Sequence, residues 1–117
     1  MIKGTGVDIV EIDRIRSAVK KYGKKFLYRI FGPQEIQYCT AFNKLKYPEL
    51  SVRFAAKEAY SKANGTGMIG IKWRQIEVYN DKKGKPLLRI NGKAKKNAHI
   101  TLSHSKDYAV ASVVIEG

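Results

Sequence analysis

Two acidic side chains that are far apart in the sequence are candidates for metal chemistry. Asp8 lies in an apolar segment near the N-terminus, and Glu58 lies in a region rich in Ala, Lys and Glu. A hard cation such as Mg2+ typically takes one or two carboxylates and fills its other positions with water and substrate phosphate. Each residue also has an ordinary interpretation, because an aspartate near a strand end often caps a turn and a helical glutamate often pairs with lysine.

Lys62 and a glycine-containing turn follow Glu58. Lys62 stands four residues later, so a helix would place both side chains on one face, as in a common helix salt bridge. Arg53 and Lys57 form a second pair at this spacing. The helix is followed by Asn64-Gly65-Thr66-Gly67, whose glycines permit the close backbone approach that a phosphate needs. This turn favours a phosphate site over a simple salt bridge.

Histidine and cysteine give weaker signals. His104 lies between two serines at a predicted strand-to-turn junction, where a side chain can project into a cleft. His99, His104 and the distant Cys39 would make a poor zinc site, and no serine–histidine–aspartate triad follows from the spacing. We predict that Cys39 is a reduced thiol in the core.

The N-terminal elements are predicted from hydrophobic periodicity. β-forming residues from Met1 to Ile12 predict a strand that carries Asp8, and its two glycines would let a ligand or another backbone segment approach closely. Helical spacing predicts a helix after Asp13, interpreted as the N-cap, with a break at Gly23. A continuous helix would align a basic ridge of Arg14, Lys21, Lys25 and Arg29.

Helices followed by a run of strands are predicted for the rest of the chain. A short helix is expected over Glu35 to Phe42 with Pro33 at its start, then a polar connection from Asn43 to Tyr47 and a long helix from Pro48 to Ala63. Alternation and turn residues predict four strands, Trp73 to Tyr79, Pro86 to Ile90, His99 to His104 and Tyr108 to Ile115. This order predicts an α+β class with a mostly antiparallel sheet.

Length and charge limit the classes of function. The chain has 117 residues, which predicts one domain over residues 1–117. Its 23 Lys and Arg against 10 Asp and Glu give a formal charge of +13, which attracts nucleic acid, anionic membranes or acidic proteins. No apolar stretch is long enough for a signal peptide or a membrane span, so we expect a cytoplasmic protein without a membrane partner.

Three motifs, taken in order, resemble the holo-acyl-carrier-protein synthases, the short, bacterial-type phosphopantetheinyl transferases. They are GTGVDIVEI from Gly4, RFAAKEAYSKANGTG from Arg53 and ITLSHS from Ile100, and the tripeptide Gly84-Lys85-Pro86 is also typical of that family. The resemblance covers essentially the whole chain. One departure is Asn64, where relatives more often carry an apolar or aromatic residue.

The resemblance implies a role for each candidate residue. Asp8 and Glu58 would hold Mg2+, which also binds the coenzyme A diphosphate, and Lys62 would contact the phosphates. The Gly65-Thr66-Gly67 turn would also contact the phosphates, His104 would lie close to the same ligand and Pro86 would line its cleft. The basic residues Arg14, Lys21, Lys25 and Arg29 would contact the acidic helix of an acyl carrier protein. The family is usually a homotrimer with sites between subunits, so that Asp8 and Glu58 need not come from one chain.

The reaction implied is attack of a carrier-protein serine on the β-phosphorus of coenzyme A, with release of adenosine 3′,5′-bisphosphate. Glu58 or a metal-bound water would accept the serine proton. The rival interpretation is a nucleic-acid-binding module that stacks bases on Trp73, Tyr79 and Tyr108. It explains the charge but gives Asp8 and Glu58 no role. A third alternative is a catalytically inactive trimeric scaffold.

Overall fold

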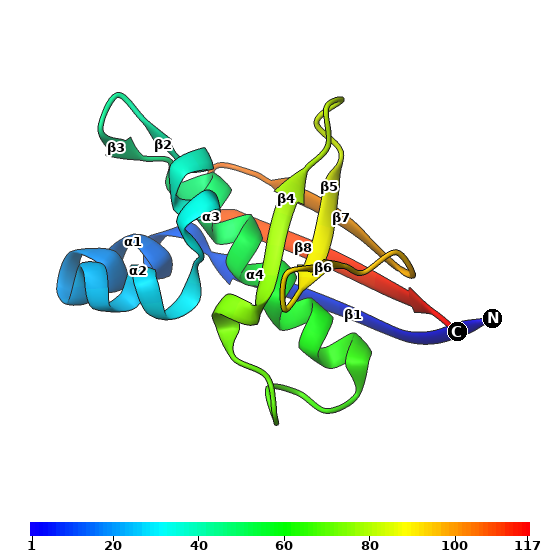
Figure 1. Ribbon diagram of the computed structural model, residues 1–117. Coiled ribbons are helices and arrows are strands. Elements are labelled where there is room, and N and C mark those ends of the chain that lie inside the picture. The colour runs from blue at the N-terminus through cyan, green and yellow to red at the C-terminus, as the bar shows by residue number, and fades with distance from the viewer.

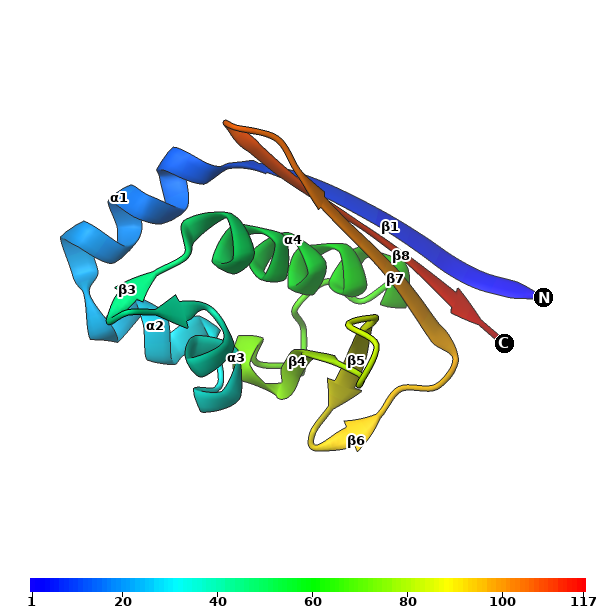
Figure 2. The same cartoon turned by 90° about the horizontal axis from the view of Figure 1, so that it is seen from above.

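A long helix lies across a three-stranded antiparallel sheet at the centre of the fold (Figure 1). The structure is a computed structural model that describes residues 1–117. The helix is α4 (Tyr47–Asn64), and the sheet has the order β1 (Ile2–Glu11), β8 (Tyr108–Glu116) and β7 (Ala98–His104). Figure 2 shows α4 against one face of this sheet, with no helix on the other. The remaining elements are α1 (Ile12–Tyr22), α2 (Lys24–Ile30), α3 (Pro33–Tyr38), β2 (Thr40–Ala41), β3 (Lys44–Leu45), a 3-10 turn η1 (Trp73–Gln75), β4 (Ile76–Asn80), β5 (Pro86–Ile90) and β6 (Lys93–Ala94).

The predicted α+β class with antiparallel strands is confirmed, but the strands form three separate sheets. Besides β1-β8-β7 there is a two-stranded sheet, β2-β3, and a three-stranded sheet, β4-β5-β6. The buried apolar side chains of all the larger elements form one core of 24 residues. None of the helices is long and apolar enough to cross a membrane.

Two glycines allow β1 to lie unusually close to α4. A Cβ built on Gly4 would be 2.0 Å from the Ala63 carbonyl oxygen, and one on Gly6 would be 2.0 Å from the Ala59 carbonyl oxygen. Side chains alternate across a strand, so Gly4, Gly6 and Asp8 face the helix together. The predicted close approach therefore involves the helix backbone, and it holds Asp8 against α4.

The N-terminal helical region consists of two helices, as the predicted break at Gly23 implies. Gly23 separates α1 from α2 and has φ of +58°, a conformation that glycine adopts without steric cost. The predicted N-cap is wrong, because α1 begins at Ile12 with Glu11 before it, and Asp13 lies in the first turn, where its carboxylate pairs with Arg16. The chain leaves β1 directly into the helix, so no side-chain cap separates the two elements.

Two further predictions of secondary structure are wrong in detail. The short helix ends at Tyr38, and the polar connection contains a small hairpin, β2-β3, whose turn places Phe42 and Asn43 at positive φ. The predicted strand from Trp73 begins only at Ile76, because residues 73–75 form a 3-10 turn in which the Gln75 side chain accepts the Lys72 N–H at 2.7 Å. The two-residue strand β6 was also not predicted.

Candidate functional site

Asp8 and Glu58 meet at one cavity of about 380 Å³ within a single chain. Asp8 comes from β1 and Glu58 from the middle of α4, and both side chains are half-buried. The remaining wall comes from β1, α1, α2 and α4 and consists of Ile9, Val10, Arg14, Ile15, Ala18, Phe26 and Phe54. The sequence predicted the two carboxylates correctly as neighbours, although they are 50 residues apart.

Lys62 joins this site through Asp8. Its Nζ lies 3.2 Å from Asp8 Oδ1 and donates to the Val7 carbonyl oxygen at 3.1 Å. The sequence predicted that Lys62 shares a face with Glu58, but its ion pair is with the aspartate of the neighbouring strand. Half of the lysine side chain remains exposed, so its ammonium group can reach a ligand outside the cavity.

The environment of Glu58 fits a divalent cation. Burial raises the pKa of the Glu58 carboxyl group above its ordinary value, the negative charge of Asp8 raises it further, and Lys62 opposes both. A cation between the two carboxylates would remove their repulsion. No third acidic, histidine or cysteine side chain completes a larger cluster. Two protein carboxylates match Mg2+, which usually takes few protein ligands and keeps positions for water and phosphate.

The glycine turn lies at the C-terminal end of α4, one turn beyond Lys62. Gly65 adopts φ of +83° and ends the helix, as predicted, and Gly67 has φ of +58°. Both glycines have open space where a Cβ would lie. Asn64 donates its side-chain amide to the Thr66 hydroxyl at 3.1 Å. The departure at Asn64 is therefore accommodated by a polar contact within the turn.

Pro86 and His104 lie away from the carboxylate cavity. Pro86 lines a separate cleft of about 520 Å³ between β5 and β7, with Lys85, Lys95 and Lys96 among its other lining residues. The His104 Nε2 lies 3.8 Å from Glu49 Oε1 near the first turns of α4. One chain therefore brings together Asp8, Glu58 and Lys62 but does not add Pro86 or His104 to their cavity.

The four basic residues of the expected ridge are exposed on two helices. Arg14 lines the carboxylate cavity, whereas Lys25 and Arg29 line another hollow with Tyr22 and Phe26. The Lys21 ammonium lies 5.3 Å from the centroid of the Tyr22 ring. The residues form a basic surface next to the cavity, but they are not aligned on one continuous helix.

Two of the three aromatic residues proposed for base stacking have other partners. The Trp73 ring stacks on Phe54 with a centroid separation of 5.2 Å, and the guanidinium of Arg89 lies 4.0 Å from the centroid of the Tyr79 ring. The nucleic-acid interpretation is therefore not supported by a free stacking surface.

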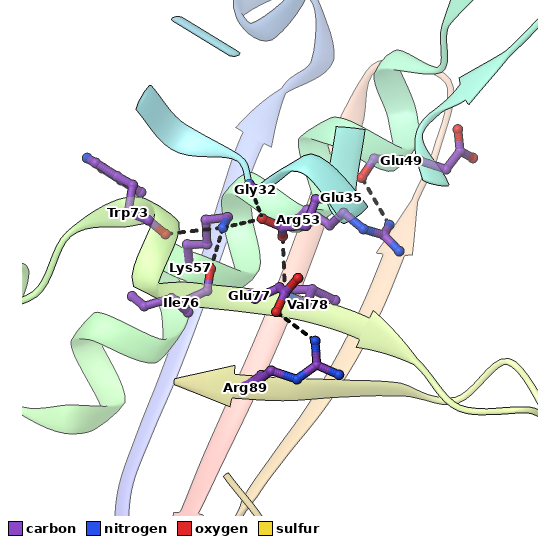
Figure 3. A network of polar contacts seen from close by, with 10 residues as sticks. All are labelled: Gly32, Glu35, Glu49, Arg53, Lys57, Trp73, Ile76, Glu77, Val78 and Arg89. Atoms are coloured by element: carbon purple, nitrogen blue, oxygen red, sulfur yellow. Dashed lines mark hydrogen bonds and ion pairs between the residues drawn. The ribbon is translucent and has the colours of Figure 1, made fainter. Parts of the chain in front are cut away.

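Sequence reasoning missed a buried ion pair beside the site (Figure 3). The sequence placed Lys57 on one helix face with Arg53 but predicted no partner for its charge; it forms an ion pair with Glu35 of α3, and neither side chain has exposed surface. Nearly all residues from Leu50 to Ala63 are buried, so α4 lacks the polar face on which a lysine is normally placed. That Ala-rich composition was the only available signal. Cys39 is buried as predicted, and burial raises its pKa to about 11.

Comparisons with known proteins cover nearly the whole chain. The family model described as the 4'-phosphopantetheinyl transferase superfamily matches residues 4–113. A protein of Halothermothrix orenii named holo-[acyl-carrier-protein] synthase is 45% identical over 99% of this chain and 98% of its own length. One from Koribacter versatilis with the same name is 43% identical over 99% of both chains.

Solved structures agree with this result. The holo-(acyl-carrier-protein) synthase of Bacillus anthracis, described in complex with CoA (3',5'-ADP), has a TM-score of 0.83 and 40% identity over 100% of this chain and 98% of that one. The enzyme from Neisseria meningitidis has a TM-score of 0.87 and 36% identity over the whole of both chains. The chain therefore belongs to the 4'-phosphopantetheinyl transferase superfamily.

Proposed function

We propose that this chain is a Mg2+-dependent holo-[acyl-carrier-protein] synthase, which transfers 4'-phosphopantetheine from coenzyme A to a serine of an apo acyl carrier protein. The observation that carries the proposal is the cavity that joins Asp8 and Glu58, with Lys62 paired to Asp8 at its edge. Relatives with that name match the chain over nearly its full length.

Asp8 and Glu58 would hold the cation, and Lys62 would bind the diphosphate. When bound, Mg2+ supplies positive charge that offsets the charge of the diphosphate in the transition state. Lys62 can exchange part of its contact with Asp8 for a phosphate oxygen, because its side chain is half exposed. The Gly65 N–H donates to the Lys62 carbonyl oxygen, so the backbone N–H groups of Thr66 and Gly67 would be the neutral donors that the turn adds to the same anion.

Glu58 would accept the serine proton, because the other carboxylate of the cavity, Asp8, is already paired with Lys62. The serine oxygen forms a bond to the β-phosphorus, the bond from that phosphorus to the oxygen of the 5'-phosphate breaks, and adenosine 3',5'-bisphosphate leaves with the bond electrons. The serine proton passes to Glu58, directly or through water.

The acidic carrier protein would dock on α1 and α2. Arg14 links this surface to the cavity, and Lys21, Lys25 and Arg29 extend it away from the reacting groups. Exposed charges of this kind mainly raise the rate of encounter with an oppositely charged partner. The net charge of +13 favours the same partner.

A homotrimer would complete the coenzyme A site. Pro86 and His104 lie outside the carboxylate cavity in one chain, so a neighbouring subunit would have to supply them. The bare face of the β1-β8-β7 sheet offers an apolar contact surface, on which Val7 is 58% and Ile9 is 64% exposed. Light scattering of the wild type and of Ile9→Asp tests this arrangement, since the charged variant should fall to the monomer mass.

The transfer itself is tested by intact-mass measurement of an apo carrier protein. After incubation with the chain, coenzyme A and Mg2+, the carrier should gain the mass of one phosphopantetheine group. A carrier whose acceptor serine is replaced by alanine is the matched control and should gain nothing. A wild-type carrier of unchanged mass, under conditions in which the chain is folded, would contradict the proposed function.

A further inference from the structure

The buried Lys57–Glu35 pair has no role in the proposed reaction. The Lys57 Nζ lies 2.7 Å from Glu35 Oε1, and both side chains are fully buried. Removing two charges from water is unfavourable, and apolar residues of similar volume are often as stable as a buried ion pair. The contribution to folding therefore does not by itself explain why these two residues are present.

All three N–H donors of the Lys57 ammonium have partners (Figure 3). Besides Glu35, they donate to the carbonyl oxygens of Trp73, at 3.2 Å, and Ile76. The Glu35 carboxylate also accepts two backbone N–H groups, from Gly32 at 3.0 Å and Val78 at 3.1 Å. The network joins α4 to the start of α3, the 3-10 turn and β4, which are segments far apart in the sequence.

The network can affect the geometry of the carboxylate site in two ways. Lys57 precedes Glu58, and successive side chains on a helix point about 100° apart, since there are 3.6 residues per turn. Fixing Lys57 toward α3 and β4 therefore fixes the direction in which Glu58 leaves α4. By the second route, Trp73, whose carbonyl oxygen accepts from Lys57, stacks on Phe54, and Phe54 lines the cavity with Asp8 and Glu58.

We propose that Lys57 and Glu35 are positioning residues that set the rotation of α4 and the Phe54 wall, and so the affinity of the carboxylate site for Mg2+ and the coenzyme A diphosphate. This inference rests on the proposed function. Groups that orient metal-binding side chains typically change metal affinity or activity by about 10- to 100-fold when they are replaced.

The test separates positioning from stability by removing both charges together. Lys57→Met alone leaves Glu35 buried without its partner, which is strongly destabilising, whereas Glu35→Gln/Lys57→Met leaves no buried charge. The matched control is Arg89→Met, which breaks the 2.8 Å Arg89–Glu77 ion pair beside the network without removing a contact to α4. Each protein is measured by thermal unfolding, by calorimetric titration with coenzyme A in the presence of Mg2+ or a chelator, and by its tryptophan emission.

The double variant should have a higher melting temperature than Lys57→Met. In the presence of Mg2+ it should nevertheless bind coenzyme A about 10- to 100-fold more weakly than the wild type. Trp73 is the only tryptophan of the chain, so its emission reports on this segment and should shift to longer wavelength as the stack on Phe54 loosens. Arg89→Met should match the wild type in affinity and emission. In a chelator, the difference in affinity between the double variant and the wild type should shrink.

Wild-type affinity in a folded double variant would overturn the inference and leave the pair a structural contact. If the double variant does not fold, Glu35→Gln carries the same comparison with the same two outcomes, because its amide oxygen can still accept from Lys57 and the ammonium keeps its two carbonyl partners. If the wild type transfers phosphopantetheine and the variants bind coenzyme A normally, the positioning role of Lys57 and Glu35 is refuted and the proposed function is not. Absence of transfer by the wild type would refute the proposed function, while the Trp73 emission would still test the link from Lys57 to the cavity wall.

Discussion

Replacing Gly6 by alanine should disturb the site without changing any of its functional groups. The new Cβ would lie 2.0 Å from the Ala59 carbonyl oxygen and 2.9 Å from the Ala63 nitrogen, and both are backbone atoms that cannot rotate away. Because such contacts essentially never fall below 3.0 Å, β1 and α4 must separate by about 1 Å. Asp8 lies two residues along the same face of β1, so it would move away from Glu58 and Lys62.

The magnitudes predict which effect dominates. Forcing an extra carbon into a packed interface typically costs about 1–3 kcal/mol, whereas the lower entropy of an unfolded chain with alanine stabilises by only about 0.4–1 kcal/mol. A displacement near 1 Å at reacting groups can reduce the rate by about 100-fold. We therefore expect a Gly6→Ala protein that folds, unfolds at lower urea concentration, and transfers phosphopantetheine about 100-fold more slowly.

Urea unfolding and steady-state transfer kinetics measure the two effects in the same preparation. Gly32→Ala is the matched control, because its Cβ would have no neighbour closer than 3.9 Å and its φ of −76° suits alanine. It should keep full activity and a wild-type or higher free energy of unfolding. A Gly6→Ala protein with both wild-type stability and wild-type rate would refute the close packing of β1 on α4 as the device that positions Asp8.

Three further predictions concern single parts of the site. Glu58→Gln should lower kcat by orders of magnitude. The raised pKa means that the folded protein holds the Glu58 proton more tightly, so the contribution of Glu58 to wild-type stability falls as pH rises above about 4.5 through the folded pKa. Urea unfolding in metal-free buffer should therefore show the variant gaining stability relative to the wild type from pH 4 to 7, and a pH-independent difference would contradict the pKa shift. Reversing Lys21 and Lys25 to glutamate should raise KM for the carrier with a smaller effect on kcat, and kcat/KM should depend less on salt concentration. Unchanged carrier kinetics would show that the carrier does not dock on α1 and α2. Gly65→Val places a β-branched residue at φ of +83° and should weaken coenzyme A binding in calorimetry, and unchanged affinity in a folded variant would leave the turn a helix stop alone.

Local sequence predicted most of the fold and the central part of the site. The motif around Asp8 and the helix carrying Glu58 and Lys62 have strong local signals, namely β-forming residues with glycine, and Ala-rich helix formers ending at Gly65. These elements form as predicted, and a single chain brings the two carboxylates to one cavity.

The features that sequence did not predict depend on contacts between distant segments. Alternation around Trp73 suggested a strand, but the turn there is held by Lys57 and by stacking on Phe54, both from α4. The two-residue strands have too few residues for a periodic pattern. Similarly, Lys57 looks like any other helical lysine in the sequence. Its burial and its pairing with Glu35 arise only when α3 and β4 pack on α4.

The most direct test of the account is to follow the mass of an apo carrier protein with wild-type chain and with Asp8→Asn, each supplied with coenzyme A and saturating Mg2+. Asn keeps the size of the side chain at position 8 but removes the charge that would hold the cation and pair with Lys62. We expect the wild type to convert the carrier to a form heavier by one phosphopantetheine group, with one adenosine 3',5'-bisphosphate released for each carrier. Asp8→Asn should be orders of magnitude slower at saturating carrier. Equal rates for the two proteins, or an unmodified carrier with the wild type, would contradict it.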